Sequence, residues 1–273
     1  MSGSCNDNCQ TCGKSCEERR EPQSFLAEPN PKSNVKRVIG VVSGKGGVGK
    51  SLVTSLLAAS LAKEGKKVGI LDADITGPSI PKLFGIHGKA MGSPDGLLPA
   101  VAADGTKIMS TNLLLESETD PVIWRGPMIA GVVKQFWSDV VWGDVDYLFV
   151  DMPPGTGDVP LTVFQSLPVD GIVVVTSPQE LVGMIVAKAV KMAGSLNIPV
   201  LGLVENMAYF VCPNCNEKHY LFGESQVDVL AQEYGIAATA QIPTDPAIAA
   251  LCDSGEVDKV ESSWLAGIIE AVS

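Results

Sequence analysis

The sequence is poor in aromatic residues, poor in basic residues and free of long apolar runs. Aromatic residues make up 5% of the 273 positions, which disfavours a surface that stacks nucleic-acid bases. Lysine and arginine number 20 against 31 acidic residues, a net charge of -11, whereas proteins that bind DNA phosphates or anionic lipid usually carry the opposite sign. No run approaches the roughly 20 apolar residues of a membrane span. DNA-binding and membrane proteins are therefore disfavoured classes.

The N-terminus also lacks the apolar segment of a signal peptide. Its first ten residues, MSGSCNDNCQ, are polar, so we expect no export and a cytoplasmic location. Cysteine thiols stay reduced in that compartment, and the seven cysteines are then not expected to form disulfides. Metal or cluster ligation becomes the favoured use of these side chains.

The chain divides into a polar extension and one larger domain. Residues 1–35 carry four cysteines and then a Pro/Asn/Ser-rich stretch, which predicts a ligand-bearing extension with a linker. Residues 36–273 alternate apolar runs with helical periods, which predicts an α/β P-loop domain with a doubly wound, mostly parallel sheet. Asp104-Gly105 predicts a hairpin turn, and residues 262–273 a closing helix. The expected strands are 37–43, 67–72, 146–151, 171–176, 200–205 and a short one before 243.

The segment GKGGVGKS at 44–51 matches the P-loop pattern G-x-x-x-x-G-K-[ST], between a predicted strand and a predicted helix. Glycines permit a tight turn whose N–H groups point at phosphate oxygens, and the helix start adds its positive end. We expect Lys50 to reach the β- and γ-phosphates and the Ser51 hydroxyl to ligate Mg²⁺. The predicted nucleotide-binding residues here are Gly44, Gly46, Gly47, Val48, Gly49, Lys50 and Ser51.

Carboxylates end two of the predicted strands. Asp151 closes the strand DYLFVD in the Walker B position, which predicts a second Mg²⁺ ligand. Gly155 and Gly157 follow in a loop whose N–H groups could sense the γ-phosphate. Asp72 and Asp74 end the strand before the sequence ITGPS. They either cap the turn or take part in the chemistry of the site.

Lys45 is a second lysine at the start of the P-loop, where an ordinary P-loop needs none. A cation at this position could stabilise the phosphate charge of a nucleotide that is bound by another subunit and faces this loop. A solvated surface lysine is the alternative.

The chain resembles the Mrp/ApbC family of iron–sulfur cluster carrier ATPases, within the MinD/ParA/nitrogenase-iron-protein class with its deviant Walker A motif. The resemblance covers about residues 36–260, and it is carried by GKGGVGKS, DADITGPSIPKLFG, WRGPM, DMPPGTGD and CPNC. It implies a homodimer with ATP at or near its interface. It also implies a cluster bridged between the two subunits by the CPNC cysteines.

The same resemblance assigns roles to individual positions. Lys45 matches the lysine that reaches the partner's nucleotide, Asp74 the carboxylate thought to position the attacking water, and Asp151 the Walker B carboxylate. Arg125 belongs to the family's RGP motif, and its role does not follow from the residues. The adenine would be framed by Asn206, Pro243 and Asp245.

Cys212 and Cys215 form a C-x-x-C pair, which supplies two thiolates to a site that wants about four. A twofold dimer would complete the set. A labile [4Fe–4S] cluster is the favoured ligand, with zinc and a redox role as alternatives. His219 follows closely and could be a ligand, although a surface histidine is favoured, and Cys252 is expected to be a small buried side chain.

The extension holds a second group of cysteines, with gaps of three, two and three residues, close to but not the same as the ferredoxin pattern. An iron–sulfur cluster or zinc both fit such a group. Its members are Cys5, Cys9, Cys12 and Cys16.

The favoured function is a homodimeric Mg²⁺-ATPase with slow turnover that receives a [4Fe–4S] cluster from scaffold proteins and passes it to apo-proteins. Lys50, Lys45 and Mg²⁺ would stabilise charge while Asp74 orients water. A positioning or partition ATPase is one alternative, but it requires DNA or membrane binding and leaves the cysteines unexplained. An ATP-gated electron donor is another, although that class contributes single cysteines from two separate places.

Overall fold

The computed structural model describes residues 26–273, apart from 75–76, 78, 116–125, 156 and 179–181. Nine strands of this part of the chain form one sheet, in the order β10-β9-β8-β1-β7-β2-β6-β5, with β11 paired to β9. Its strands are β1 (Asn34–Ser43), β2 (Val68–Asp72), β5 (Ala100–Val101), β6 (Lys107–Met109), β7 (Asp144–Asp151), β8 (Gly171–Thr176), β9 (Val200–Val211), β10 (Lys218–His219) and β11 (Ala238–Pro243). β3 (Met91–Ser93) and β4 (Gly96–Leu98) pair with each other in a separate two-stranded sheet.

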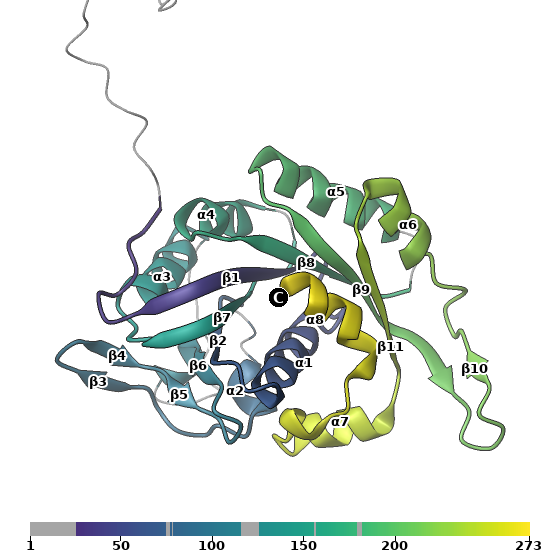
Figure 1. The fold of residues 1–273 in the computed structure, drawn as a ribbon, viewed down its shortest axis with the longest axis horizontal. Coiled ribbons are helices and arrows are strands. Elements are labelled where there is room, and N and C mark those ends of the chain that lie inside the picture. The colour runs from purple at the N-terminus through teal and green to yellow at the C-terminus, as the bar shows by residue number, and fades with distance from the viewer. Residues whose placement is uncertain (1–25, 75–76, 78, 116–125, 156, 179–181) are drawn as a thin grey trace, which may run out of the picture.

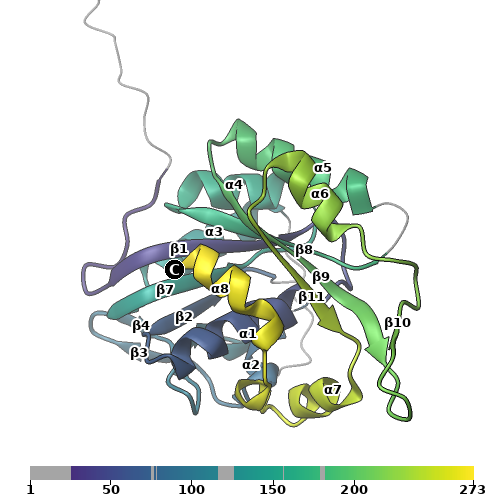
Figure 2. The same cartoon turned by 45° about the vertical axis from the view of Figure 1, so that its right-hand side comes forward.

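Helices cover both faces of this sheet. One cluster of buried apolar side chains joins α1, α2, α7 and α8 to one face, and a second joins α3, α4, α5 and α6 to the other. Figure 2 shows α5 and α6 across β9 and β11 from α1 and α8. The helices are α1 (Lys50–Lys63), α2 (Ile80–Leu83), α3 (Gly126–Ser138), α4 (Asp158–Ser166), α5 (Val182–Ser195), α6 (Val227–Tyr234), α7 (Pro246–Asp253) and α8 (Ala266–Val272).

The predicted doubly wound, mostly parallel sheet is confirmed. β1 lies between β7 and β8 and pairs in parallel with both, and β2 pairs in parallel with β7. All six residues of β8 are buried, because a parallel strand under helices on both faces has no solvent side. The carboxyl ends of β1, β2 and β7 therefore meet at one edge, where open α/β sheets bind their ligands.

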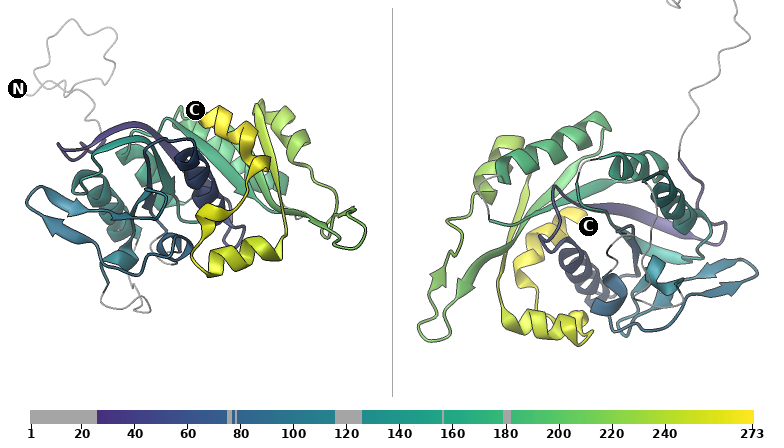
Figure 3. Two further views of the ribbon diagram at one scale, coloured as in Figure 1. Left: turned by 60° about the horizontal axis from the view of Figure 1, so that its bottom comes forward. Right: turned by 180° about the vertical axis from the view of Figure 1, so that it is seen from behind.

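Several sequence expectations were met and one strand was underestimated. The turn at Asp104-Gly105 joins the antiparallel strands β5 and β6, as predicted. β9 continues to Val211, well past the expected end at 205, and pairs with β10 in a second hairpin that projects from the edge of the sheet (Figures 1 and 3). None of the described helices is both long enough and apolar enough to cross a bilayer.

The closing helix is also confirmed and is docked on the core. It comprises a short 3-10 turn at Ser263–Leu265 and then α8, with Leu265, Ile268 and Val272 fully buried. Ile268 packs beside Gly202 of β9, where a side chain would collide with it. The C-terminal helix α8 therefore covers part of one face of the sheet.

Replacement of Ile268 by alanine should lower the free energy of unfolding by about 2–5 kcal/mol, because it leaves a cavity in a packed core. The matched control is Ile269→Ala, one residue along on the half-buried side of the same helix, which should cost clearly less. Urea unfolding of both variants measures the difference. Equal losses would contradict the docked position of α8.

Candidate functional site

The P-loop connects β1 to α1 and depends on two left-handed glycines. Gly47 and Gly49 have φ angles of 78° and 80°, a region that residues with a side chain rarely adopt. A side chain at Gly49 would also collide with the amide group of Asn206. That amide nitrogen donates a hydrogen bond to the carbonyl of Val48 at 3.0 Å, so Asn206 braces the loop from β9.

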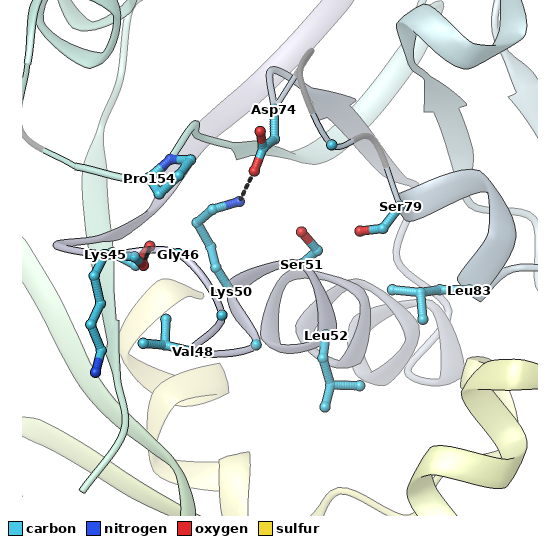
Figure 4. Close-up of a pocket in the computed structure, with 14 residues that line it drawn as sticks. Lys45, Gly46, Val48, Lys50, Ser51, Leu52, Asp74, Ser79, Leu83 and Pro154 are labelled. Carbon is cyan, nitrogen blue, oxygen red and sulfur yellow. Dashed lines mark hydrogen bonds and ion pairs between the residues drawn. The ribbon is translucent and has the colours of Figure 1, made fainter. Parts of the chain in front are cut away.

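A cavity of about 340 Å³ lies over this loop (Figure 4). Its lining brings together most of the predicted nucleotide site, with Asp74 facing Lys50 across the opening. The side chain of Lys45 extends away from Lys50 in this view. The lining residues from the predicted set are Lys45, Gly46, Gly47, Val48, Gly49, Lys50, Ser51 and Asp74.

Asp151 is the fully buried acceptor at the floor of the site. Lys50 Nζ lies 2.7 Å from its Oδ1, and the hydroxyls of Ser51 and Thr54 donate to its two oxygens at 2.5 and 2.9 Å. A buried charge requires such a partner, because desolvation would otherwise cost several kcal/mol. The Ser51 hydroxyl and the Asp151 carboxylate are oxygen donors of the kind that Mg²⁺ takes, so this donor set fits the predicted ion.

The carboxyl groups of Asp72 and Asp74 both lie close to Lys50. Asp74 Oδ2 lies 3.7 Å from Lys50 Nζ. Asp72 is fully buried and accepts hydrogen bonds from the Ser110 hydroxyl at 3.0 Å and the Asp74 backbone N–H at 3.1 Å. Burial, and then the nearby charge of Asp151, raise the pKa of Asp72 to about 8. Asp72 therefore keeps a proton at neutral pH.

The loop after β7 is tied to the end of β1. The backbone N–H groups of Met152 and Gly155 donate to the carbonyls of Val41 and Ser43, at 3.1 and 2.8 Å. The Gly155 N–H group, predicted to sense the γ-phosphate, is thus engaged with β1 in this structure. Gly157 stands at the N-cap of α4.

The residues predicted to frame the adenine sit outside the cavity lining. Asn206 lies within β9, not after it, and contacts the P-loop as described. Pro243 ends β11 and pairs with Tyr209 of β9. Asp245 caps α7, where its carboxylate accepts from the Ala247 N–H at 2.8 Å. These contacts explain Asp245 as a helix cap and leave its nucleotide role a prediction.

The CPNC pair occupies the tip of the β9–β10 hairpin. The Cys212 N–H donates to the carbonyl of Glu217, and the Asn216 N–H to the carbonyl of Cys212, both at 2.9 Å. Hydrogen bonds to the Cys212 thiolate, from the backbone N–H groups of Cys215 and then Asn214, hold the pKa of this thiol below its usual value. Cys215 is exposed, and Cys212 is half-buried. Both sulfurs are therefore open to exchange with a partner.

His219 joins this group, although the sequence favoured a surface histidine without a ligand role. One ligand atom each from Cys212, Cys215 and His219 lie within 4.8 Å of one another. The signal that was missed is the pairing of β10 with β9. Cys252 is half-buried on α7, and burial raises the pKa of its thiol. The predicted ligands Cys5, Cys9, Cys12 and Cys16, together with Arg125, lie outside the described residues.

Comparison with known proteins finds similarity to P-loop NTPases and to iron–sulfur cluster carrier proteins. The model of a family described as ParA, NUBPL iron-transfer P-loop NTPase, matches residues 34–272. An iron–sulfur cluster carrier protein of Methanocaldococcus jannaschii is 47% identical over 250 residues, 88% of this chain and 85% of that protein. A nucleotide-binding protein of Archaeoglobus fulgidus, solved in complex with ADP and with Co, has a TM-score of 0.78 at 49% identity and covers 85% of this chain and 91% of that one. The cell division ATPase MinD of Pyrococcus furiosus shares the fold alone, with a TM-score of 0.59, 20% identity and 86% and 96% coverage.

Because Asp72 is protonated, we expect the free energy of unfolding of the metal-free protein to depend on pH. Between about pH 4 and 8 the folded chain keeps a proton that the unfolded chain loses, so rising pH favours unfolding. Asp72→Asn cannot ionise and should remove this contribution, which makes the variant progressively more stable than the wild type toward pH 8. Urea unfolding in EDTA at several pH values checks this. Parallel pH profiles for the two proteins would contradict it.

Proposed function

The chain belongs to the family of NUBPL iron-transfer P-loop NTPases, and we propose that it is a homodimeric, Mg²⁺-dependent ATPase that carries a [4Fe–4S] cluster and delivers it to apo-proteins. The observation that carries the proposal is the course of β9. This strand braces the P-loop through Asn206 and ends next to Cys212. A change at the nucleotide site therefore has a direct route to the cysteine pair.

The cluster is the cargo, and each subunit supplies half of its ligands. A [4Fe–4S] cluster takes about four thiolates, and the hairpin of one chain offers Cys212 and Cys215. A twofold axis through the cluster would bring in the same pair from a second copy. The exposed position of the pair favours release to an acceptor. The carrier name of the relative at 47% identity supports this cargo.

Binding of ATP to the P-loop site would replace contacts that the site makes within the protein, such as that between Lys50 and Asp151. Lys50 would leave Asp151 and turn to the β- and γ-phosphates, while Ser51 and Asp151 would hold Mg²⁺, whose charge would offset that of the phosphates. Asp74, facing the cavity beside Lys50, orients the attacking water. Lys45 extends away from its own loop and acts on the nucleotide of the other subunit. Turnover is slow, as expected for a switch.

We expect a cytoplasmic protein that receives clusters from scaffold proteins and binds neither nucleic acid nor membrane. The four cysteines near the N-terminus would hold a second iron–sulfur cluster or zinc, ahead of the segment that leads into β1 at Asn34.

Loss of both hairpin cysteines should abolish the bridging cluster. In full-length protein with its four N-terminal cysteines replaced by serine, anaerobic reconstitution should give about four iron and four sulfide per dimer. Cys212→Ala/Cys215→Ala should lose them, whereas Cys252→Ala, which changes a cysteine on α7, should retain them. Iron and sulfide analysis measures the result, and a full cluster in the double variant would overturn the proposal.

Lys45→Ala should slow ATP hydrolysis by about 100-fold or more, because it removes a cation from the developing phosphate charge. Lys66→Ala, an exposed lysine just after α1, is the matched control and should hydrolyse ATP normally. Phosphate release at saturating MgATP measures both.

A mixture of two inactive variants tests whether Lys45 acts across the interface. A heterodimer of Lys45→Ala and Lys50→Ala subunits contains one nucleotide site with both lysines only if Lys45 comes from the partner. Mixing should therefore restore part of the ATPase activity. No recovery from subunits that form mixed dimers would place Lys45 in its own site.

A further inference from the structure

The β9–β10 hairpin brings a histidine to the cysteine pair. Cys212 and Cys215 occupy its tip, and His219 lies on the returning strand, with one ligand atom of each within 4.8 Å of the others. This is the one group of three or more such ligand residues found among the described residues. All three side chains are at least partly exposed, so an ion can reach them from solvent.

Strand pairing explains why the histidine faces the cysteines. His219 pairs with Phe210 in antiparallel register, so both side chains point to the same face of the hairpin. Cys212 lies two residues beyond Phe210 and shares this face, because side chains alternate along a strand. Cys212 and His219 are thus diagonal neighbours, a separation that a long side chain can span.

The residues beside His219 are fixed on the other face. Lys218 Nζ lies 4.3 Å from the centre of the Tyr209 ring, and the Tyr220 ring meets that same ring edge-on at 6.4 Å between centres. The turn itself is set by Asn216, whose φ angle is 60°, a conformation that asparagine tolerates better than most residues. These contacts hold the three ligand side chains together before any ion binds.

We propose that Cys212, Cys215 and His219 of a single protomer bind one divalent transition-metal ion of the zinc class. Two thiolates and an imidazole are ligands that Zn²⁺ prefers, and three protein ligands leave the fourth tetrahedral position open. Two thiolates, a neutral imidazole and a divalent ion carry no net charge, so the loaded site needs no counter-ion. Both thiol groups lose their protons to solvent when the ion binds.

This site shares its cysteines with the proposed cluster but requires neither the cluster nor the dimer. One ion per protomer occupies both thiolates, so the ion and the bridging cluster exclude each other. His219 then decides which cargo the hairpin keeps, because it adds a ligand to a single ion and has no place in a set of four thiolates. Removal of His219 should therefore weaken zinc binding and leave cluster loading intact.

The test uses full-length protein whose four N-terminal cysteines are replaced by serine, loaded with Zn²⁺ alone. Bound zinc per protomer, zinc affinity and the zinc-edge X-ray absorption spectrum are measured. We expect one zinc per protomer, with two sulfurs at about 2.3 Å and a nitrogen at about 2.0–2.1 Å. His219→Ala should lose the imidazole signal, and its zinc affinity should fall at least about tenfold. Loss of a group that only hydrogen-bonds to a metal ligand already lowers metal affinity by that factor, and His219 is a ligand itself.

Two further variants serve as a rescue and as a control. His219→Cys should restore tight binding with three sulfurs. His87→Ala, at the other histidine of the chain, should bind zinc as the wild type does. Unchanged affinity in His219→Ala, or one zinc with four sulfurs per two protomers, would overturn the site. Cluster loading is measured separately, so this proposal and the carrier function fail independently.

Discussion

The buried contact between Lys50 and Asp151 governs the carboxyl edge of the sheet. Three carboxylates, Asp72, Asp74 and Asp151, converge on one lysine, and this excess of negative charge is relieved by a proton on Asp72 and by hydroxyl donors to Asp151. Lys50 cannot turn to phosphate without exposing Asp151 to the loss of its counter-ion. Under the proposed function, nucleotide and Mg²⁺ would therefore bind together, because the metal would replace the cation that the phosphates take away from Asp151.

β9 runs from the nucleotide site to the cysteine pair. Asn206 of this strand donates a hydrogen bond to the carbonyl of Val48 and leaves no room for a side chain at Gly49, so the P-loop is tied directly to β9. Six residues further along, a span of about 20 Å, the chain reaches Cys212. The β9–β10 hairpin that carries this cysteine is joined to the rest of the sheet through β9.

The parts of the site that are contiguous in sequence could be predicted, and those assembled by strand pairing could not. GKGGVGKS and the strand ending in Asp151 can be identified from the local sequence pattern. The bounds of β8 are predicted correctly, because its burial makes the strand almost entirely apolar. The length of β9 was hidden, since its outer half loses the continuous burial of a covered strand. The proton on Asp72 depends on Asp151, which is far away in the sequence. The register that brings His219 to the cysteines depends on the unpredicted extension of β9, because His219 pairs with Phe210 in that part of the strand.

Transfer of the cluster from the reconstituted dimer to an apo [4Fe–4S] protein tests the central claim, that the nucleotide site controls the hairpin. The acceptor's recovered absorbance and activity would be followed with and without MgATP, in the wild type and in Asn206→Ala. The account predicts that MgATP changes the transfer rate in the wild type and that the change is lost when the contact between Asn206 and the P-loop is removed. Transfer at one rate in the wild type, with or without nucleotide, would contradict it.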